Sequence, residues 1–170
     1  AAPGVLACAG GVSKVNAAMT AQILCLHFGV DLILNAGVAG CLTDLPTGSL
    51  VVASEFVQHD VDTTAVGDPI GLVSTVNRVD FPTWQPEYCA ALLQELGYPA
   101  SIGRGATGDW FAVRGERAAW LRDTFSPLLV EMEGGAIAQV CLRNGVRFAA
   151  VKSVSDHLFS DNQAQEDFDF

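Results

Sequence analysis

The chain is organised around residues 130–138, which read Val130-Glu131-Met132-Glu133-Gly134-Gly135-Ala136-Ile137-Ala138. The apolar run 128–130 predicts the end of a buried strand, and the apolar residues at 136, 137, 140 and 141 have helical spacing. Glu131 and Glu133 therefore lie where a strand ends and a helix begins. Open α/β sheets bind ligands at such strand ends, and helix N-termini favour anionic groups. Acidic residues are also common in first helical turns, so the triplet alone fits an ordinary helix start equally well.

Length and composition limit the classes of protein to which this chain can belong. Its 170 residues suit one globular domain with a substantial core, since half of them are hydrophobic and 16% are charged. A net charge of −10 argues against nucleic acid or an anionic membrane as a partner, and no apolar run is long enough to cross a bilayer. Five scattered cysteines without a CxxC spacing, and the lack of a basic signal-peptide region, predict reduced thiols, no metal and a cytoplasmic protein.

Strand and helix patterns alternate along the chain. Strands are predicted at 5–9, 32–34, 50–53, from 102 onward and at 149–154, and helices after Ser13, over 86–96 and over 114–124. Ser13 can cap the first of these helices, whose apolar face carries Val15, Met19, Ile23 and Leu26. Residues 66–86 are rich in turn-forming residues and predict a long loop. The alternation indicates an α/β sandwich around a parallel or mixed sheet.

Four of the predicted strand ends carry residues that suit a small-molecule site. The small residues 35–40 predict a turn at the end of the strand 32–34, where a backbone can approach a ligand closely. The carboxylates at 131 and 133 lie at the end of a second predicted strand. Ser155-Asp156 ends the last strand, and Trp110-Phe111 are either core residues or a stacking wall for a planar ligand. Because these ends converge on one edge of the sheet, we expect a ligand pocket there.

One further cluster, His59, Asp60 and Asp62, raises the question of a metal ion. An H-x-D pairing suits a metal, but no third ligand lies at a recognised spacing. The favoured interpretation is therefore a solvated acidic segment.

The sequence resembles the nucleoside phosphorylase/nucleosidase superfamily over nearly its whole length, and within it the bacterial 5′-methylthioadenosine/S-adenosylhomocysteine nucleosidase branch. The most specific matches are Val130–Glu133 followed by Ala136–Ala138, and Val154-Ser155-Asp156; further matches are 11–18, 35–40, 48–52, 59–62 and 107–111. The resemblance implies a three-layer α/β/α sandwich with a central mixed, largely parallel sheet, formed by a single domain over 1–170. The family has an additional first strand and a closing helix, so it also implies a fragment that is incomplete at both ends.

The resemblance implies an enzyme that hydrolyses the N-glycosidic bond of a purine nucleoside, releases adenine and serves methionine salvage. It implies a homodimer and no cofactor. Asp156 would protonate purine N7 with Ser155 orienting it, and Glu133 would accept a hydrogen bond from the ribose 2′-hydroxyl. The substrate-binding residues would be Phe111 and Ala112 at the base, Met132 and Glu131 beside the sugar, and Val12, Val38, Ala39 and Gly40 on the ribosyl side.

Two alternatives to hydrolysis stay open. Phosphorylases of this superfamily hold phosphate with Arg and Ser where this chain has Asn35 and Val38, which favours water as the nucleophile. However, Ser155-Asp156-His157-Leu158 resembles the phosphorylase form of that motif. No residue matches the family's water-activating acid, so a non-catalytic nucleoside-binding relative is the other alternative. Thr63, Val66 and Asp68 replace the family's partner-subunit aromatics, which leaves the 5′ substituent open and makes 66–86 a candidate dimer element.

Overall fold

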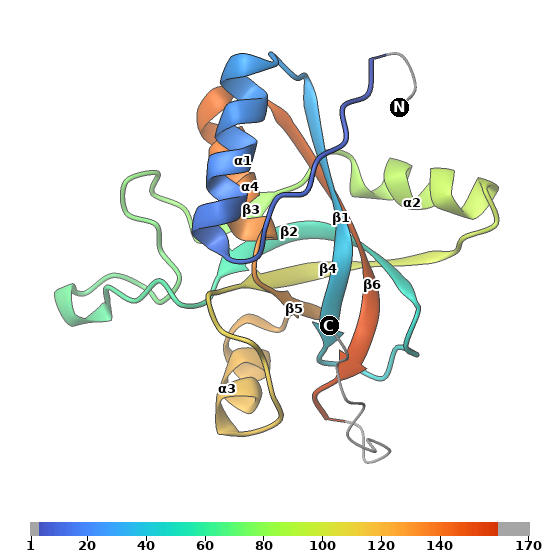
Figure 1. Ribbon diagram of the computed structural model, residues 1–170. Coiled ribbons are helices and arrows are strands. Elements are labelled where there is room, and N and C mark those ends of the chain that lie inside the picture. The colour runs from blue at the N-terminus through green and yellow to red at the C-terminus, as the bar shows by residue number, and fades with distance from the viewer. Residues whose placement is uncertain (1–3, 160–170) are drawn as a thin grey trace.

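The computed structural model describes residues 4–159, so expectations about the two ends of the chain lie outside this range. Helices and strands alternate from α1 to β6 (Figure 1). The helices are α1 (Lys14–His27), α2 (Pro86–Glu95), α3 (Glu116–Phe125) and α4 (Gly134–Asn144), with a short 3₁₀ turn η1 (Thr64–Val66). The strands are β1 (Leu32–Cys41), β2 (Leu50–Gln58), β3 (Asp80–Pro82), β4 (Ala100–Thr107), β5 (Leu129–Glu131) and β6 (Arg147–His157).

The six strands form one mixed sheet in the order β3-β2-β4-β5-β1-β6. The pairs β1–β6, β2–β4 and β4–β5 are parallel, whereas β1–β5 and β2–β3 are antiparallel. The predicted mixed α/β fold is thus confirmed. The sheet nevertheless closes on itself instead of forming the flat middle layer of a sandwich, because β2 also pairs with β6. Register shifts after Ala39 in β1 and after Ala53 in β2 accompany the bending that closure requires.

Helices pack against the outside of this closed sheet. α1 and α4 lie side by side (Figure 1), and their small buried residues Ala17, Ala21 and Ala138 share a core cluster with Phe56 and Phe148. α3 covers another part of the sheet through Leu121 and Phe125. No helix among residues 4–159 has the length and apolar character needed to span a bilayer.

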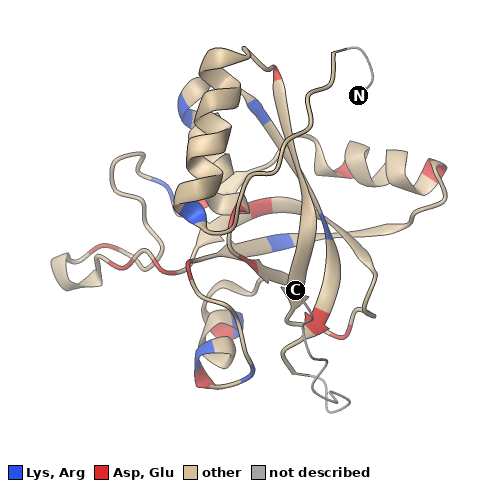
Figure 2. Ribbon diagram, in the orientation of Figure 1, with Lys and Arg blue, Asp and Glu red and all other residues tan. Residues whose placement is uncertain are grey.

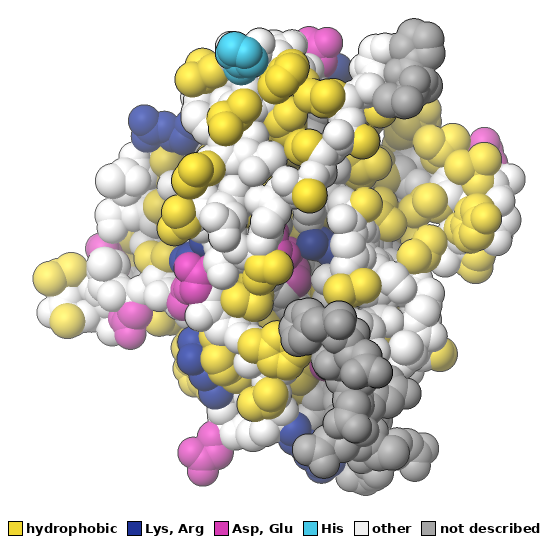
Figure 3. Space-filling model, in the orientation of Figure 1, with side chains coloured by type: hydrophobic (Ala, Val, Ile, Leu, Met, Phe, Trp, Pro, Cys, Tyr) yellow, Lys and Arg dark blue, Asp and Glu magenta, His cyan; other side chains and the backbone are white. Residues whose placement is uncertain are grey.

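The predicted apolar face of α1 is exposed. Val15, Met19, Ile23 and Leu26 keep between 53% and 74% of their surface accessible, whereas Ala17 and Ala21 are buried against α4. Ala17 and Ala21 allow α1 to approach α4 closely, and Leu24 and Cys25 pack partly against the same core cluster, while the four larger side chains lie on the exposed side. Figure 2 shows that α1 carries few charges, and Figure 3 shows hydrophobic side chains gathered over it.

Several local predictions differ from the structure. Residues 5–9 are not a strand, because within the described range no strand pairs with them. Residues 35–40 are not a turn: they continue β1, paired along β6. The predicted loop 66–86 contains the edge strand β3. Ser13 precedes α1 with a φ of 80° and its side chain makes no capping hydrogen bond.

The helix predicted over 86–96 is confirmed as α2. It begins at Pro86 and is followed by Gly97 at a φ of +86°, a conformation that glycine adopts without strain.

Phe56 fills a narrow space between two glycines. A Cβ added at Gly105 would lie 2.4 Å from its Cε1 atom, and a Cβ added at Gly134 would also lie 2.4 Å from that atom. Phe56 has no accessible surface. Glycine at both positions thus allows β4 and the start of α4 to approach the same aromatic ring.

We expect Gly105→Ala to lower the free energy of unfolding by about 1–3 kcal/mol or more, because the added methyl overlaps the Phe56 ring. Phe56→Leu should cost less in the Gly105→Ala background than in wild type, since it removes the overlap. Gly10→Ala is the matched control, as nothing lies within 4 Å of its added Cβ. Urea unfolding gives the free energy of unfolding of wild type, the two single core variants, their double variant and Gly10→Ala. Additive effects of the two core substitutions would contradict the steric explanation.

Candidate active site

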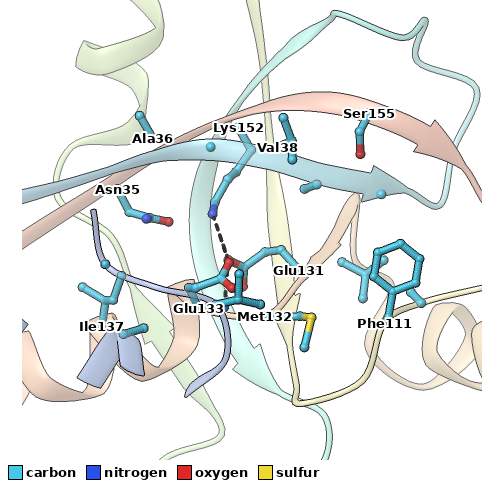
Figure 4. A pocket seen from close by; sticks show the side chains of 18 of the residues that line it. Asn35, Ala36, Val38, Phe111, Glu131, Met132, Glu133, Ile137, Lys152 and Ser155 are labelled. Carbon is cyan, nitrogen blue, oxygen red and sulfur yellow. Dashed lines mark hydrogen bonds and ion pairs between the residues drawn. The ribbon is translucent and has the colours of Figure 1, made fainter. Parts of the chain in front are cut away.

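One cavity of about 400 Å³ lies between the β5–α4 junction, strands β1 and β6, and the loops that precede α1 and follow β4. Figure 4 shows Ser155 and Phe111 at one end of the cavity, Asn35 and Ile137 at the other, and Glu133 and Lys152 between them. All eleven residues predicted for the site line this one cavity, namely Val12, Val38, Ala39, Gly40, Phe111, Ala112, Glu131, Met132, Glu133, Ser155 and Asp156. The arrangement therefore brings together every site residue proposed from the sequence.

Glu131 is buried, and protein donors already occupy its carboxylate. Lys152 Nζ lies 2.9 Å from Oε2, the Gly134 N–H donates to both oxygens at 2.9 and 2.8 Å, and the Glu133 N–H donates to Oε2 at 3.1 Å. The hydroxyl of Thr107 donates to Oε1. Glu131 thus joins β4, β6 and the first turn of α4, and it acts on the cavity mainly by holding its neighbours in place.

Lys152 is a site residue that the sequence reasoning missed. Its side chain retains only 2% of its exposure, and its ammonium lies 2.9 Å from Glu131 and 3.9 Å from Glu133. Fully buried lysines are rare unless they are paired, so a lysine inside the otherwise apolar run 149–154 was the available signal. In the fold the positive charge of this lysine balances the negative charge of one of the two carboxylates beside it.

Glu133 is the less buried of the two glutamates, with 20% of its side chain exposed. Burial and the neighbouring Glu131 raise its pKa, while the Ser13 N–H and Lys152 offset part of that effect. The Ser13 N–H donates to Oε1 at 3.1 Å. This contact links the carboxylate to the loop before α1, so the position of that loop affects where Glu133 points.

Asp156 and Ser155 lie near the end of β6. The Ser155 hydroxyl donates to Oδ1 of Asp156 at 2.6 Å, as expected if the serine orients the acid. The register shift in β1 pairs Gly40 with Asp156, and a Cβ at Gly40 would lie 3.4 Å from Oδ2 and 2.9 Å from a Leu158 methyl. Glycine at position 40 thus lets β1 pass close to the carboxyl group.

The two adjacent aromatics have different environments. Trp110 packs edge-on against His59, with ring centroids 5.9 Å apart, and the Arg117 guanidinium lies 4.2 Å from its ring centre. Phe111 lines the cavity and is 54% exposed. Both aromatics therefore line the cavity, and Trp110 also packs among protein side chains.

The segment after β2 is only in part a solvated acidic stretch: Asp62 is exposed, but His59 and Asp60 are not. His59 is buried, burial lowers its pKa, and neither ring nitrogen has a partner among residues 4–159. Asp60 is partly buried and lies 2.6 Å from Lys14 Nζ. The expectation of solvation was wrong for His59 and Asp60 because their partners, Trp110 and Lys14, are distant in the sequence.

Comparisons with known proteins agree with this geometry. Residues 2–170 match the family described as the Phosphorylase superfamily. The chain is 41% identical over 151 residues to a 5′-methylthioadenosine/S-adenosylhomocysteine nucleosidase of Geobacillus thermodenitrificans, covering 86% of this chain and 64% of that protein. It is 36% identical to an aminodeoxyfutalosine nucleosidase of Helicobacter pylori, covering 93% and 68%. The chain thus spans just under two thirds of the length of the first of these relatives.

Solved structures extend the similarity to the fold. The crystal structure of Campylobacter jejuni 5′-methylthioadenosine/S-adenosyl homocysteine nucleosidase superposes with a TM-score of 0.85 at 32% identity, covering 94% of this chain and 69% of that one. A Helicobacter pylori enzyme of the same name, solved with butyl-thio-DADMe-Immucillin-A, gives a TM-score of 0.82 at 34% identity over 86% and 64%. Sequence, fold and cavity together show that the chain belongs to the phosphorylase superfamily.

Proposed function

We propose that the protein hydrolyses the N-glycosidic bond of a purine nucleoside and releases adenine and a ribose derivative. The observation that carries this proposal is that the carboxyl groups of Glu133 and Asp156 line one cavity together with Phe111. A purine and a ribose need an acid at the base, a hydrogen-bond acceptor at the sugar and a flat apolar surface. The names of the relatives, which are nucleosidases, add further support.

In this proposal Asp156 protonates purine N7 as the glycosidic bond breaks. Loss of the base from the sugar leaves positive charge on the ribosyl ring, and a neutral purine is a far better leaving group than its anion. The Ser155 hydroxyl engages Oδ1 and leaves Oδ2 to face the base. The carboxyl proton then moves from Asp156 to N7.

Glu133 has the complementary role at the sugar. As an ionised carboxylate it accepts a hydrogen bond from the 2′-hydroxyl, and this bond strengthens as the ring becomes cationic. The nearby Lys152 pairs with Glu131 at 2.9 Å, so the negative charge of Glu133 is the one left for the substrate. The sugar is surrounded by Met132, Val12, Val38, Ala39 and Gly40. The base contacts Phe111 and Ala112.

Water is the favoured nucleophile. Phosphorylases of this family would use an Arg and a Ser where this chain has Asn35 and Val38, and the Lys152 ammonium is already paired with Glu131. The buried Oδ1 of Asn35 has no hydrogen-bond partner among residues 4–159, and Asn35 lines the cavity. That oxygen is therefore available to accept a hydrogen bond from a water molecule, whereas it would repel a phosphate oxygen.

We also propose a homodimer formed through the exposed apolar face of α1, which we define as Val15, Met19, Ile23 and Leu26. Contiguous exposed apolar side chains indicate an interaction surface, and twofold homodimers use one patch on both subunits. The methionine-salvage role depends on the 5′ substituent of the substrate, and it stays a prediction, as does the cytoplasmic location.

We expect Asp156→Asn to reduce the rate of adenine release by about 100-fold or more, because an amide cannot supply the proton. The thermal midpoint should stay close to that of wild type. Ser155→Ala is the matched control: it keeps the acid but removes the orienting hydroxyl, so its rate should fall less. Adenine release from methylthioadenosine, followed by absorbance, measures both; near-normal turnover of Asp156→Asn would rule out the acid role.

The nucleophile is tested by incubating wild-type protein with methylthioadenosine, with and without inorganic phosphate. Hydrolysis predicts the same rate of adenine release under both conditions and 5-methylthioribose, without a phosphate ester, as the sugar product. Adenine that appears only with phosphate would establish phosphorolysis instead. No adenine under either condition would favour the non-catalytic relative.

The raised pKa of Glu133 predicts the acid limb of the pH profile. The carboxylate must be ionised to accept the 2′-hydroxyl, so kcat/KM should fall as pH drops through a pKa above the usual range for glutamate. Ionisation of a group with a raised pKa also costs stability at neutral pH. Glu133→Gln should therefore be nearly inactive at pH 7 yet unfold at the same or a higher temperature; a lower unfolding temperature would contradict this argument.

We expect Ile23→Glu to convert the dimer into a monomer, because it places a charge in the centre of the α1 face. Leu92→Glu on α2 is the matched control, since Leu92 is 45% exposed and Ile23 53%. Sedimentation velocity of the three proteins at equal concentration measures the assembly state. A monomeric wild type, or a dimer that survives Ile23→Glu but not Leu92→Glu, would exclude the α1 face.

A further inference from the structure

A closed set of polar contacts outside the cavity connects two of its walls. Asp60, two residues beyond β2, lies 2.6 Å from Lys14 Nζ through Oδ1 and accepts the Asp109 N–H through Oδ2 at 2.9 Å. The Asp109 carboxylate in turn accepts the backbone N–H of Lys14 at 2.8 Å. Each of the three residues thus contacts the other two, and we call this set the Asp60 clamp.

The clamp joins segments that are almost one hundred residues apart in the chain. Lys14 begins α1 directly after Gly10–Val12, which line the cavity, and Asp109 directly precedes Trp110–Ala112, which line it elsewhere. Figure 1 shows the first turn of α1 close to the ends of β2 and β4. Asp60 thus holds the side chain of one segment and the backbone of the other, and the Asp109 carboxylate completes the set at the backbone N–H of Lys14.

Neighbouring contacts make the clamp rigid. Lys14 Nζ also donates to Gln58 at 3.4 Å, and Gln58 donates to Gln139 on α4 at 2.7 Å. A Cβ at Gly108 would lie 2.4 Å from the His59 ring, so the imidazole fits directly against this backbone. Burial opposes ionisation of Asp60, but the Lys14 ammonium and the Asp109 N–H outweigh it and hold the pKa of the carboxyl below its usual range.

We propose that Asp60 is a positioning residue that, with Lys14 and Asp109, sets the separation between the ribose-side loop and the aromatic wall of the cavity. The inference rests on the proposed function only in assigning those walls to a nucleoside. Asp60 does not line the cavity. It acts by keeping Phe111 and Val12 at the spacing that a bound purine nucleoside requires, which affects substrate binding in the ground state and the transition state alike.

The test substitutes the clamp and compares binding with turnover. Asp60→Asn and Lys14→Met should each raise KM for methylthioadenosine and the dissociation constant of adenine roughly tenfold, while kcat changes less than about threefold. The double variant should be no worse than the worse single variant, because both substitutions break the same ion pair. Isothermal titration calorimetry gives the adenine affinity independently of catalysis.

Glu55→Gln is the matched control. Glu55 forms an ion pair with Arg104 at 2.7 Å, similar in length to the Lys14–Asp60 pair, and neither partner lines the cavity. This variant should alter the thermal midpoint without altering KM or adenine affinity. A purely structural role for Asp60 predicts the same behaviour from Asp60→Asn, namely lower stability with unchanged adenine affinity, and that result would overturn the inference.

The outcomes separate the clamp from the proposed function. If wild-type protein binds adenine but hydrolyses no nucleoside, the proposed hydrolysis fails, while the change in adenine affinity still decides the clamp. If wild-type protein binds no adenine at millimolar concentration, the assignment of the walls is wrong and the inference falls with it. Independent, multiplicative effects of the Lys14 and Asp60 substitutions on affinity would also overturn it.

Discussion

The cavity depends on one buried carboxylate. Glu131 takes hydrogen bonds from Thr107 at the end of β4 and from the first turn of α4, and it pairs with Lys152 on β6 at 2.9 Å. An ionised group of this kind is tolerated in an interior only when its partners are complete. Because those partners come from three separate elements, the carboxylate holds them in one relative arrangement, and the floor of the cavity follows from it.

The same arrangement separates the roles of two glutamates that are two residues apart. Glu131 forms an ion pair with Lys152, and protein donors contact both of its carboxylate oxygens. Glu133 instead has a raised pKa and lines the cavity with part of its side chain exposed. Two like charges so close together can both ionise only if one has a dedicated cation. Lys152 meets that need, which is why a basic residue inside an apolar strand is part of this site although it was absent from the sequence-based set.

The loops around the cavity are held by contacts between segments that are distant in the sequence. The Ser13 N–H donates to Glu133, and Lys14 contacts Asp60 and Asp109, so the start of α1 is connected to both the Glu133 wall and the Phe111 wall of the cavity. α1 itself uses alanines to pack against α4 and leaves its larger apolar side chains exposed. In the proposals made above, the first turn of this helix organises the site and its outer face contacts a second subunit.

The sequence by itself determined the mixed α/β class and eleven of the residues that line the cavity, because strand ends and family motifs are local patterns that can be recognised without the fold. It also predicted α2 correctly, since Pro86 favours the start of a helix and Gly97 its end, and both effects are local to the backbone. Only the tertiary structure decided that the sheet closes through β2 and β6, that β1 runs on through residues 35–40, and that Lys152 and Asp60 are paired. Those features depend on partners between about 20 and about 115 residues away, and no local pattern records which buried charge or strand edge a residue will meet.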